Sequence, residues 1–194
     1  MKLLACGIIS LSIALMTIAL CWTLNPWFDF WRDAFSDFGV ERARFPWLYN
    51  GGLIISSIFF MLYSIGIYRV SSHKLEALSS GLLMTASIFL ALIGLFPGGT
   101  RPHNFVSTWF FLQSFWGFST LGVAISLKGD KVRGSLISIP SALSPIIALA
   151  IDLTLGWLSA ALAEALGISV LALSLLSSIS HYLGRRQPPS SGIP

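Results

Sequence analysis

Charged residues are scarce in this chain. Only 10% of its 194 residues are Asp, Glu, Lys or Arg, whereas 55% are hydrophobic, and the mean hydropathy is +0.79. A soluble domain usually carries about 25% charged residues, so this chain has too few to cover a surface that faces water. The composition excludes a soluble enzyme and a nucleic-acid-binding domain, and it indicates a protein that crosses a membrane several times.

Cysteines and metal-binding patterns are also nearly absent. The only two cysteines, Cys6 and Cys21, lie on one hydrophobic run, where a helix would separate them by ~22 Å. A disulfide needs Cα atoms within about 7 Å of each other, so these two cannot form one. The spacing of histidine, cysteine and acidic residues matches no known metal site. We therefore expect neither a metal nor any other cofactor.

Six hydrophobic runs are long enough to cross a bilayer, which takes about 20 apolar residues. The runs are continuously apolar, which favours helices over the alternating strands of a barrel. The first run is too long for the core of a signal peptide, so we expect it to be retained. The sequence predicts an all-α, polytopic membrane domain at 1–186 and a disordered tail at 187–194, with spans at about 3–24, 47–68, 78–96, 104–127, 135–155 and 157–182.

The basic residues predict the orientation of the chain. If the N-terminus is cytoplasmic, eight Lys and Arg residues lie on the cytoplasmic side and four lie outside. Cytoplasmic loops collect basic residues, so we expect a cell-membrane protein with both termini in the cytoplasm. The four outside residues are Arg32, Arg42, Arg44 and Arg101.

The loop after the first span reads as an amphipathic helix at about 26–38. Asn25 is suited to cap its start, Pro26 to occupy its first turn, and Gly39 to end it. On a helical wheel the tryptophans and phenylalanines fall on one side and the acidic residues on the other. This pattern predicts a helix lying at the membrane interface, either as a lid over the bundle or as a simple connector.

Several short motifs carry a family resemblance. They are Ser36-Asp37-Phe38-Gly39, the Asn50-Gly51-Gly52 start of the second span, Gly94-Leu95-Phe96-Pro97, and then His103. In this order they resemble the domain-of-unknown-function 998 family of bacterial and archaeal six-helix membrane proteins, over most of the chain. That family usually has leucine where this chain has Phe38. The Ser-Asp-x-Gly element also resembles, more remotely, the Frag/damage-regulated autophagy modulator group, which is linked to lipid remodelling and membrane traffic.

Polar residues converge on the outer side of the predicted bundle. An ionisable residue inside a span is costly and usually faces a cavity or a partner, which makes Glu164 the strongest pointer to a site. We expect a polar pocket there, whose candidate residues are Ser36, Asp37, Asn50, Arg101, His103, Asn104, Asp152 and Glu164.

Each of these residues also has a structural interpretation. Asp37 can pair with an arginine of the outer loops, and His103 can hydrogen bond within its own loop. Asn50 can cap or pack at the start of its helix, and Asp152 can cap a turn. Glu164 can be protonated and bonded to a neighbouring helix. No catalytic motif identifies an enzyme, and a Ser36–His103–Asp37 triad is awkward because its serine and aspartate are adjacent.

Two packing features bear on the function. Pro140 and Pro145 should kink the fifth span and free carbonyls that line a cavity. Ser159, Ala163 and Gly167 form a small-residue stripe that suits close helix contact.

Three hypotheses for the function follow from the sequence. The first is a protein that handles lipids or small molecules in an extracytoplasmic pocket. The second is a non-catalytic subunit of a larger membrane complex, and the third is a transporter.

Overall fold

A computed structural model of the chain describes residues 2–184, and within them it contains six α-helices and no strand. All six are long and apolar enough to cross a membrane. The predicted all-α, six-helix membrane fold is therefore confirmed, whereas the predicted tail at 187–194 lies outside the described residues. The elements are α1 (Lys2–Leu24), the 3₁₀ helix η1 (Phe35–Gly39), α2 (Pro46–Val70), α3 (Lys74–Leu95), α4 (His103–Leu127), α5 (Lys131–Thr154) and α6 (Ala160–Gly184).

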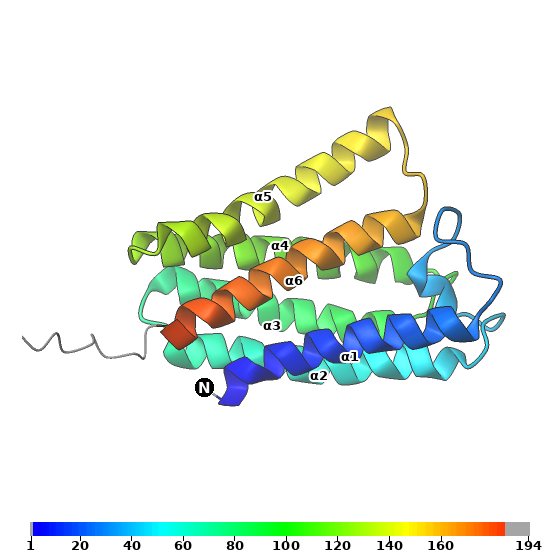
Figure 1. Ribbon diagram of the computed structural model, residues 1–194, viewed down its shortest axis with the longest axis horizontal. Coiled ribbons are helices and arrows are strands. Elements are labelled where there is room, and N and C mark those ends of the chain that lie inside the picture. The colour runs from blue at the N-terminus through cyan, green and yellow to red at the C-terminus, as the bar shows by residue number, and fades with distance from the viewer. Residues whose placement is uncertain (1, 185–194) are drawn as a thin grey trace, which may run out of the picture.

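The helices run up and down in sequence order. Each of α1 to α5 packs against the next, and α6 returns across the bundle to contact α4 and α1 (Figure 1). The N-terminus and the α2–α3 and α4–α5 connections share one end, which we call the inner end. The loop 25–45 between α1 and α2, which we call the outer loop, shares the outer end with loops 96–102 and 155–159. These names follow the orientation that the basic residues predict.

Hydroxyl groups and small residues join the helices. Apolar side chains gain little by leaving lipid for protein, so close packing and hydrogen bonds hold membrane helices together. The hydroxyl of Ser10 on α1 donates to the carbonyl of Ser56 on α2 at 2.9 Å. On the other side of the bundle, the hydroxyls of Tyr63 and Ser178 are hydrogen-bonded and buried. Gly52 lets α2 approach the side chain of Thr17 so closely that a methyl group would overlap it.

A buried ion pair fastens the inner end. Glu76 on α3 has a fully buried side chain and accepts a hydrogen bond from the ammonium of Lys128, just after α4. It also accepts one from the hydroxyl of Tyr182 on α6 at 2.8 Å, and two from the backbone N–H groups of Ser72 and His73. One carboxylate thus ties together three helices.

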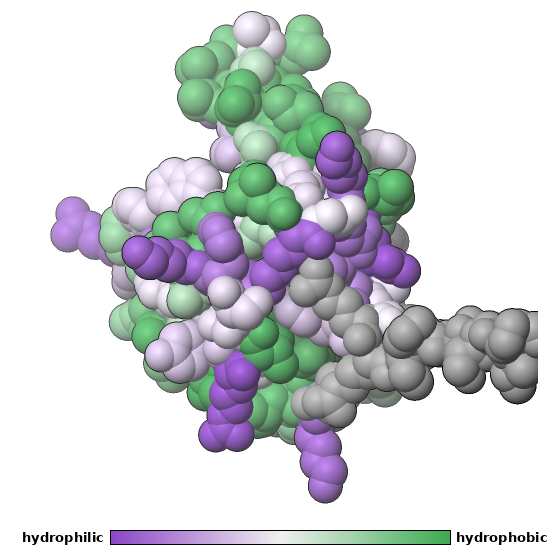
Figure 2. Space-filling model, turned by 90° about the vertical axis from the view of Figure 1, so that its left-hand side faces the viewer, coloured by the Kyte–Doolittle hydropathy of each residue, from purple (hydrophilic) through white to green (hydrophobic). Residues whose placement is uncertain are grey.

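A second ionic cluster lies beside it, in the α4–α5 turn. Asp130 accepts hydrogen bonds from Nδ1 of His181 at 2.7 Å and from Nη1 of Arg133 at 2.9 Å. The hydrogen bond from His181, aided by Arg133, lowers the pKa of Asp130 to about 2. Hydrophilic side chains gather on this inner face of the molecule (Figure 2).

The fifth helix leans away from the bundle over its outer half (Figure 1). Pro140 and Pro145 lie within it, in a helix that continues unbroken from Lys131 to Thr154. Beyond them its large apolar side chains are exposed, up to 73% for Leu153. The inner half stays in contact with α4, where Gly122 and Gly134 bring the two backbones close together.

The predicted amphipathic helix at 26–38 is wrong. The segment forms turns followed by the short η1. Its aspartates bond to nearby backbone N–H groups, because Asp29 accepts from Trp31 and Asp33 accepts from Asp29. Such local bonds compete with helix formation. Asn25 does not cap a helix either. Its amide oxygen accepts a hydrogen bond from the backbone N–H of Arg44, and this bond joins the two ends of the outer loop.

Three phenylalanines of the outer loop, Phe28, Phe35 and Phe38, fold inward instead of lying along one helix face, while Trp27 and Trp31 stay exposed. Phe28 and Phe38 are buried, with ring centroids 4.5 Å apart, and Phe30 stacks on Trp22 at the end of α1. Burial of this cluster positions η1 above the centre of the bundle, where it contacts α1, α2 and α6.

Candidate functional site

A cavity of about 110 Å³ lies inside the bundle, below the outer loop. Side chains from α1, α2, α3, α4, α6 and the outer loop line it, and none from α5 does. The prediction that the proline-containing fifth span lines a cavity is therefore wrong for this one.

The wall of the cavity is apolar along most of its length. On α6 the lining runs from Glu164 to Leu175, which spans about 16 Å at 1.5 Å per residue. Opposite walls are formed by residues such as Leu53, Phe60 and Phe118. The hydrocarbon core of a bilayer is about 30 Å thick, so the cavity is about as deep as one leaflet.

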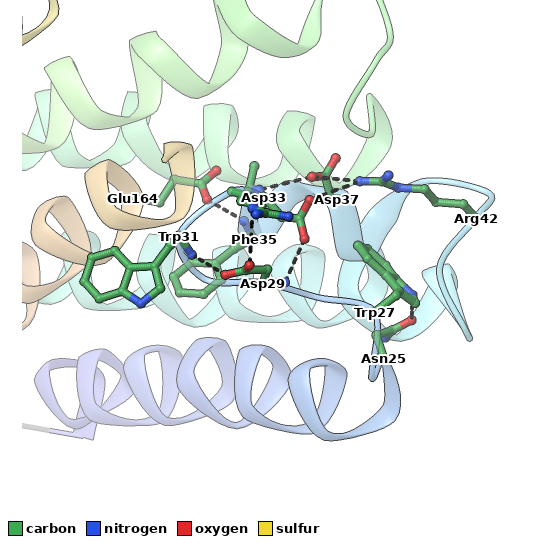
Figure 3. Close-up of polar contacts among 11 residues, drawn as sticks. Asn25, Trp27, Asp29, Trp31, Asp33, Phe35, Asp37, Arg42 and Glu164 are labelled. Atoms are coloured by element: carbon green, nitrogen blue, oxygen red, sulfur yellow. Dashed lines mark hydrogen bonds and ion pairs between the residues drawn. The ribbon is translucent and has the colours of Figure 1, made fainter. Parts of the chain in front are cut away.

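Glu164 stands at the outer end of this cavity, one turn into α6. The backbone N–H of Phe35 donates to its Oε2 at 2.7 Å (Figure 3). The N–H and hydroxyl of Ser36 lie close to the same carboxyl group. The partner is thus the outer loop rather than a neighbouring helix. A second hydrogen bond joins the start of α6 to the outer loop, because the hydroxyl of Ser159 donates to the carbonyl of Phe30 at 2.7 Å.

His103 lines the same cavity from the first turn of α4 and is buried. Its Nδ1 lies 2.8 Å from the carbonyl oxygen of Phe96, which can only accept, so Nδ1 carries the proton. In a neutral imidazole the other nitrogen, Nε2, is then an acceptor. Within residues 2–184 no hydrogen-bond partner occupies Nε2, so it is available to a ligand.

Ser36 is buried in η1 and lines the cavity, but its neighbour Asp37 does not. Asp37 accepts from the backbone N–H of Ala34 and pairs with Arg42 at 3.0 Å, on the surface of the outer loop. Of the two interpretations of Asp37, the ion pair within the outer loops is the one that the geometry favours.

Asn50 holds the outer loop from below. Its amide nitrogen donates to the carbonyl of Gly39 at 3.0 Å, and a Cβ on Gly39 would overlap the same amide group. The backbone carbonyl oxygen of Asn50 lies so close to Gly94 on α3 that a Cβ on this glycine would overlap it. Three of the four motifs that carry the family resemblance, those with Gly39, Asn50 and Gly94, thus meet at one packing point.

Three candidate residues lie away from the cavity. Arg101, Asn104 and Asp152 are exposed, and none of them is among the residues that line it. The topology places them at the outer end, as predicted. However, Asp152 belongs to the half of α5 that leans away, and Asn104 follows His103 on a different face of α4.

Sequence reasoning missed other polar residues. Tyr49 and Ser107 line the outer end of the cavity, and each resembles an ordinary residue of an apolar run. Glu76 was missed as well, although an acidic residue at the third position of α3 is the signal of a capping box. Among the described residues, no group of three or more His, Cys, Asp and Glu side chains is close enough to hold a metal ion.

Comparison with known proteins gives a family and no closer relative. The profile of a family described as protein of unknown function (DUF998) matches residues 8–181. This match covers most of the chain and confirms the resemblance expected from the motifs. No curated protein and no solved structure matches the chain.

Proposed function

The chain belongs to the DUF998 family of proteins of unknown function, and we propose that it binds a single-chain membrane lipid in the cavity below the outer loop. The observation that carries this proposal is the composition of the cavity wall. The cavity is about 16 Å deep, its wall is apolar along most of that depth, and it is polar at the outer end, where Glu164, His103 and Ser36 line it. This arrangement matches a lipid, with its chain in the apolar part and its headgroup at the polar end.

The position of the polar end supports the same assignment. His103 is the first residue of α4, and Glu164 lies about 6 Å below the start of α6. Both therefore stand near the level where lipid headgroups meet water. The basic residues favour the extracytoplasmic leaflet, because Lys128, Lys131 and Arg133 cluster at the opposite end with the N-terminus.

The depth of the cavity limits the ligand to one chain. A depth of one leaflet matches the length of a single hydrocarbon chain. A volume of about 110 Å³ is below that of an ordinary ligand pocket, so the lining side chains would have to move apart to admit even one chain, and the two chains of a common phospholipid are excluded. Such a protein would carry, sense or present a lipid. Handling of this kind needs no catalytic motif, in agreement with the sequence.

Native mass spectrometry of the protein, extracted gently from its own membrane, tests the proposal. We expect the wild type to carry a lipid mass. The substitution Ala14→Phe, which fills the cavity from α1, should remove that mass. Ala19→Phe on the exposed face of the same helix is the matched control and should keep it. A wild-type chain without lipid, or a lipid that survives Ala14→Phe, would refute the proposal.

The exposed half of α5 supports a second candidate function, that of a subunit in a larger membrane complex. Ile146, Leu149 and Leu153 present an apolar face that no described part of the chain covers, with 64%, 59% and 73% of each residue exposed. Native mass spectrometry also separates the two functions. A co-purifying protein chain that cross-links to a photoreactive residue in place of Leu153, and not to one in place of Leu173 on α6, favours the role of a complex subunit. A lone chain with lipid favours the first function.

A further inference from the structure

The outer end of the cavity offers hydrogen-bond acceptors and contains no basic side chain. The carboxyl group of Glu164 and Nε2 of His103 are acceptors there. The hydroxyls of Ser36, Tyr49 and Ser107 can donate or accept, so they do not discriminate between headgroups. Among the residues that line the cavity there is no Lys and no Arg.

The carboxyl group of Glu164 keeps room for a ligand. A carboxylate offers about four lone-pair sites. The N–H of Phe35 occupies one, and the N–H and hydroxyl of Ser36 lie beside the group. Even if each of these three donors takes one site, about one of the four remains, and Glu164 itself lines the cavity. A headgroup that reaches Glu164 from the cavity can therefore still donate to it.

An arginine of the outer loop is paired on the surface. Arg42 pairs with Asp37 at 3.0 Å and stacks over the ring of Trp27 at 4.6 Å, and its side chain is 57% exposed. It therefore belongs to the surface of the outer loop and does not line the cavity. Asp37, in turn, adds negative charge near Glu164. The residues that line the polar end therefore include no lysine or arginine that could receive an anionic headgroup.

This chemistry distinguishes between headgroup classes. A phosphate or carboxylate would face Glu164 in a poorly solvated site with no opposite charge, which is costly. A hydroxyl or an ammonium group can donate to Glu164 and to His103, and so satisfies acceptors that are otherwise left open. We propose that the cavity selects single-chain lipids whose headgroup donates hydrogen bonds and carries no negative charge. This inference rests on the proposed function, because it assigns the headgroup of the lipid whose chain fills the cavity.

Four probes with the same chain test the inference: hexadecanol, hexadecylamine, hexadecanoic acid and hexadecyl phosphate. Each is added at neutral pH to the full chain in phosphatidylcholine nanodiscs, and its occupancy is measured by native mass spectrometry. We expect the alcohol and the amine to bind at least about tenfold more tightly than the acid and the phosphate, as expected when one buried hydrogen bond is gained or lost. This ranking needs no variant, so it does not depend on a mutant that folds.

Two substitutions distinguish the binding of a hydroxyl headgroup from the binding of an ammonium headgroup. Glu164→Gln replaces the carboxyl group by an amide that cannot ionise but keeps an acceptor oxygen, so it should weaken the amine by about tenfold and the alcohol less. His103→Asn keeps a donor for the carbonyl of Phe96 but lacks Nε2, so it should weaken the alcohol too. The controls are Asp152→Asn and Asn104→Ala, since both side chains are exposed and lie away from the cavity.

The outcomes separate this inference from the function on which it rests. If hexadecyl phosphate binds as tightly as hexadecanol, and Ala14→Phe blocks both, the headgroup assignment is wrong and the lipid cavity stands. If none of the four probes binds better to the wild type than to Ala14→Phe, the proposed function itself is wrong.

Discussion

The backbone N–H of Phe35 donates a hydrogen bond of 2.7 Å to Oε2 of Glu164. The two residues are far apart in the sequence, and the bond fixes the outer loop over α6 at the polar end of the cavity. It also explains how a carboxyl group is tolerated inside a membrane helix, because the bond to a backbone N–H offsets part of the loss of water. Glu164 therefore holds the outer loop as well as lining the cavity.

Loss of the Glu164 carboxyl group should loosen the outer loop. In Glu164→Ala the N–H of Phe35 loses its acceptor, and an unpaired buried donor costs about 1–3 kcal/mol. We expect a lower midpoint of thermal unfolding in detergent, with a smaller loss in Glu164→Gln, whose amide oxygen still accepts. Equal midpoints for Glu164→Ala and the wild type would show that the bond contributes nothing.

The ion pair between Glu76 and Lys128 predicts a larger effect. Lys128→Met leaves the fully buried carboxylate of Glu76 without its cation, and breaking such a pair costs about 3–5 kcal/mol. The double variant Glu76→Gln/Lys128→Met should recover much of the loss, because no buried charge remains. Unfolding in detergent against denaturant measures both, and Lys131→Met, at an exposed position, is the control. A double variant less stable than Lys128→Met would contradict this account.

The lowered pKa of Asp130 predicts that the stability of the folded protein depends on pH. Its pKa is lowered from 3.8 to about 2 by the bond from His181, so folding favours its ionised form. The stability it contributes is complete above its ordinary pKa and disappears as the pH falls to about 2. We expect Asp130→Asn to be less stable than the wild type at neutral pH, and the difference to shrink between about pH 4 and pH 2. A difference between Asp130→Asn and the wild type that stays constant over this pH range would refute the assignment.

The membrane spans could be predicted because each depends on a local property. A run of about 20 apolar residues specifies a spanning helix whatever lies beside it, so the predicted and observed bounds differ by only a few residues at most ends. The outer loop could not be predicted in this way. Its wheel pattern fits a helix, but Asp29, Asp33 and Asp37 bond to the local backbone, and Phe28 and Phe38 find a buried cluster that the pattern does not reveal.

The candidate site was predictable only in part, for a similar reason. Topology alone places polar residues at the outer end, and Glu164 stood out because a buried acid needs a partner. Depth and direction depend on how the helices pack. Asp152 therefore lies away from the cavity, on the half of α5 that leans outward. Tyr49, which looks like an ordinary residue of an apolar run, lines the cavity. The role of Glu76 depends on Lys128 and Tyr182, which come from distant parts of the chain.

Two adjacent glycines provide a matched test of the packing that supports the site. A Cβ on Gly52 would overlap the side chain of Thr17 on α1, whereas a Cβ on Gly51 meets no atom within 4 Å. We expect Gly52→Ala to force α1 and α2 apart and to cost about 1–3 kcal/mol. Gly51→Ala should be neutral or stabilising by up to about 1 kcal/mol, since alanine favours a helix over glycine. Unfolding in detergent measures both. Because intrinsic helix preference would raise both variants alike, a lower stability in Gly52→Ala alone isolates the contact with Thr17, and equal stabilities would show that α1 does not pack against α2 at this point.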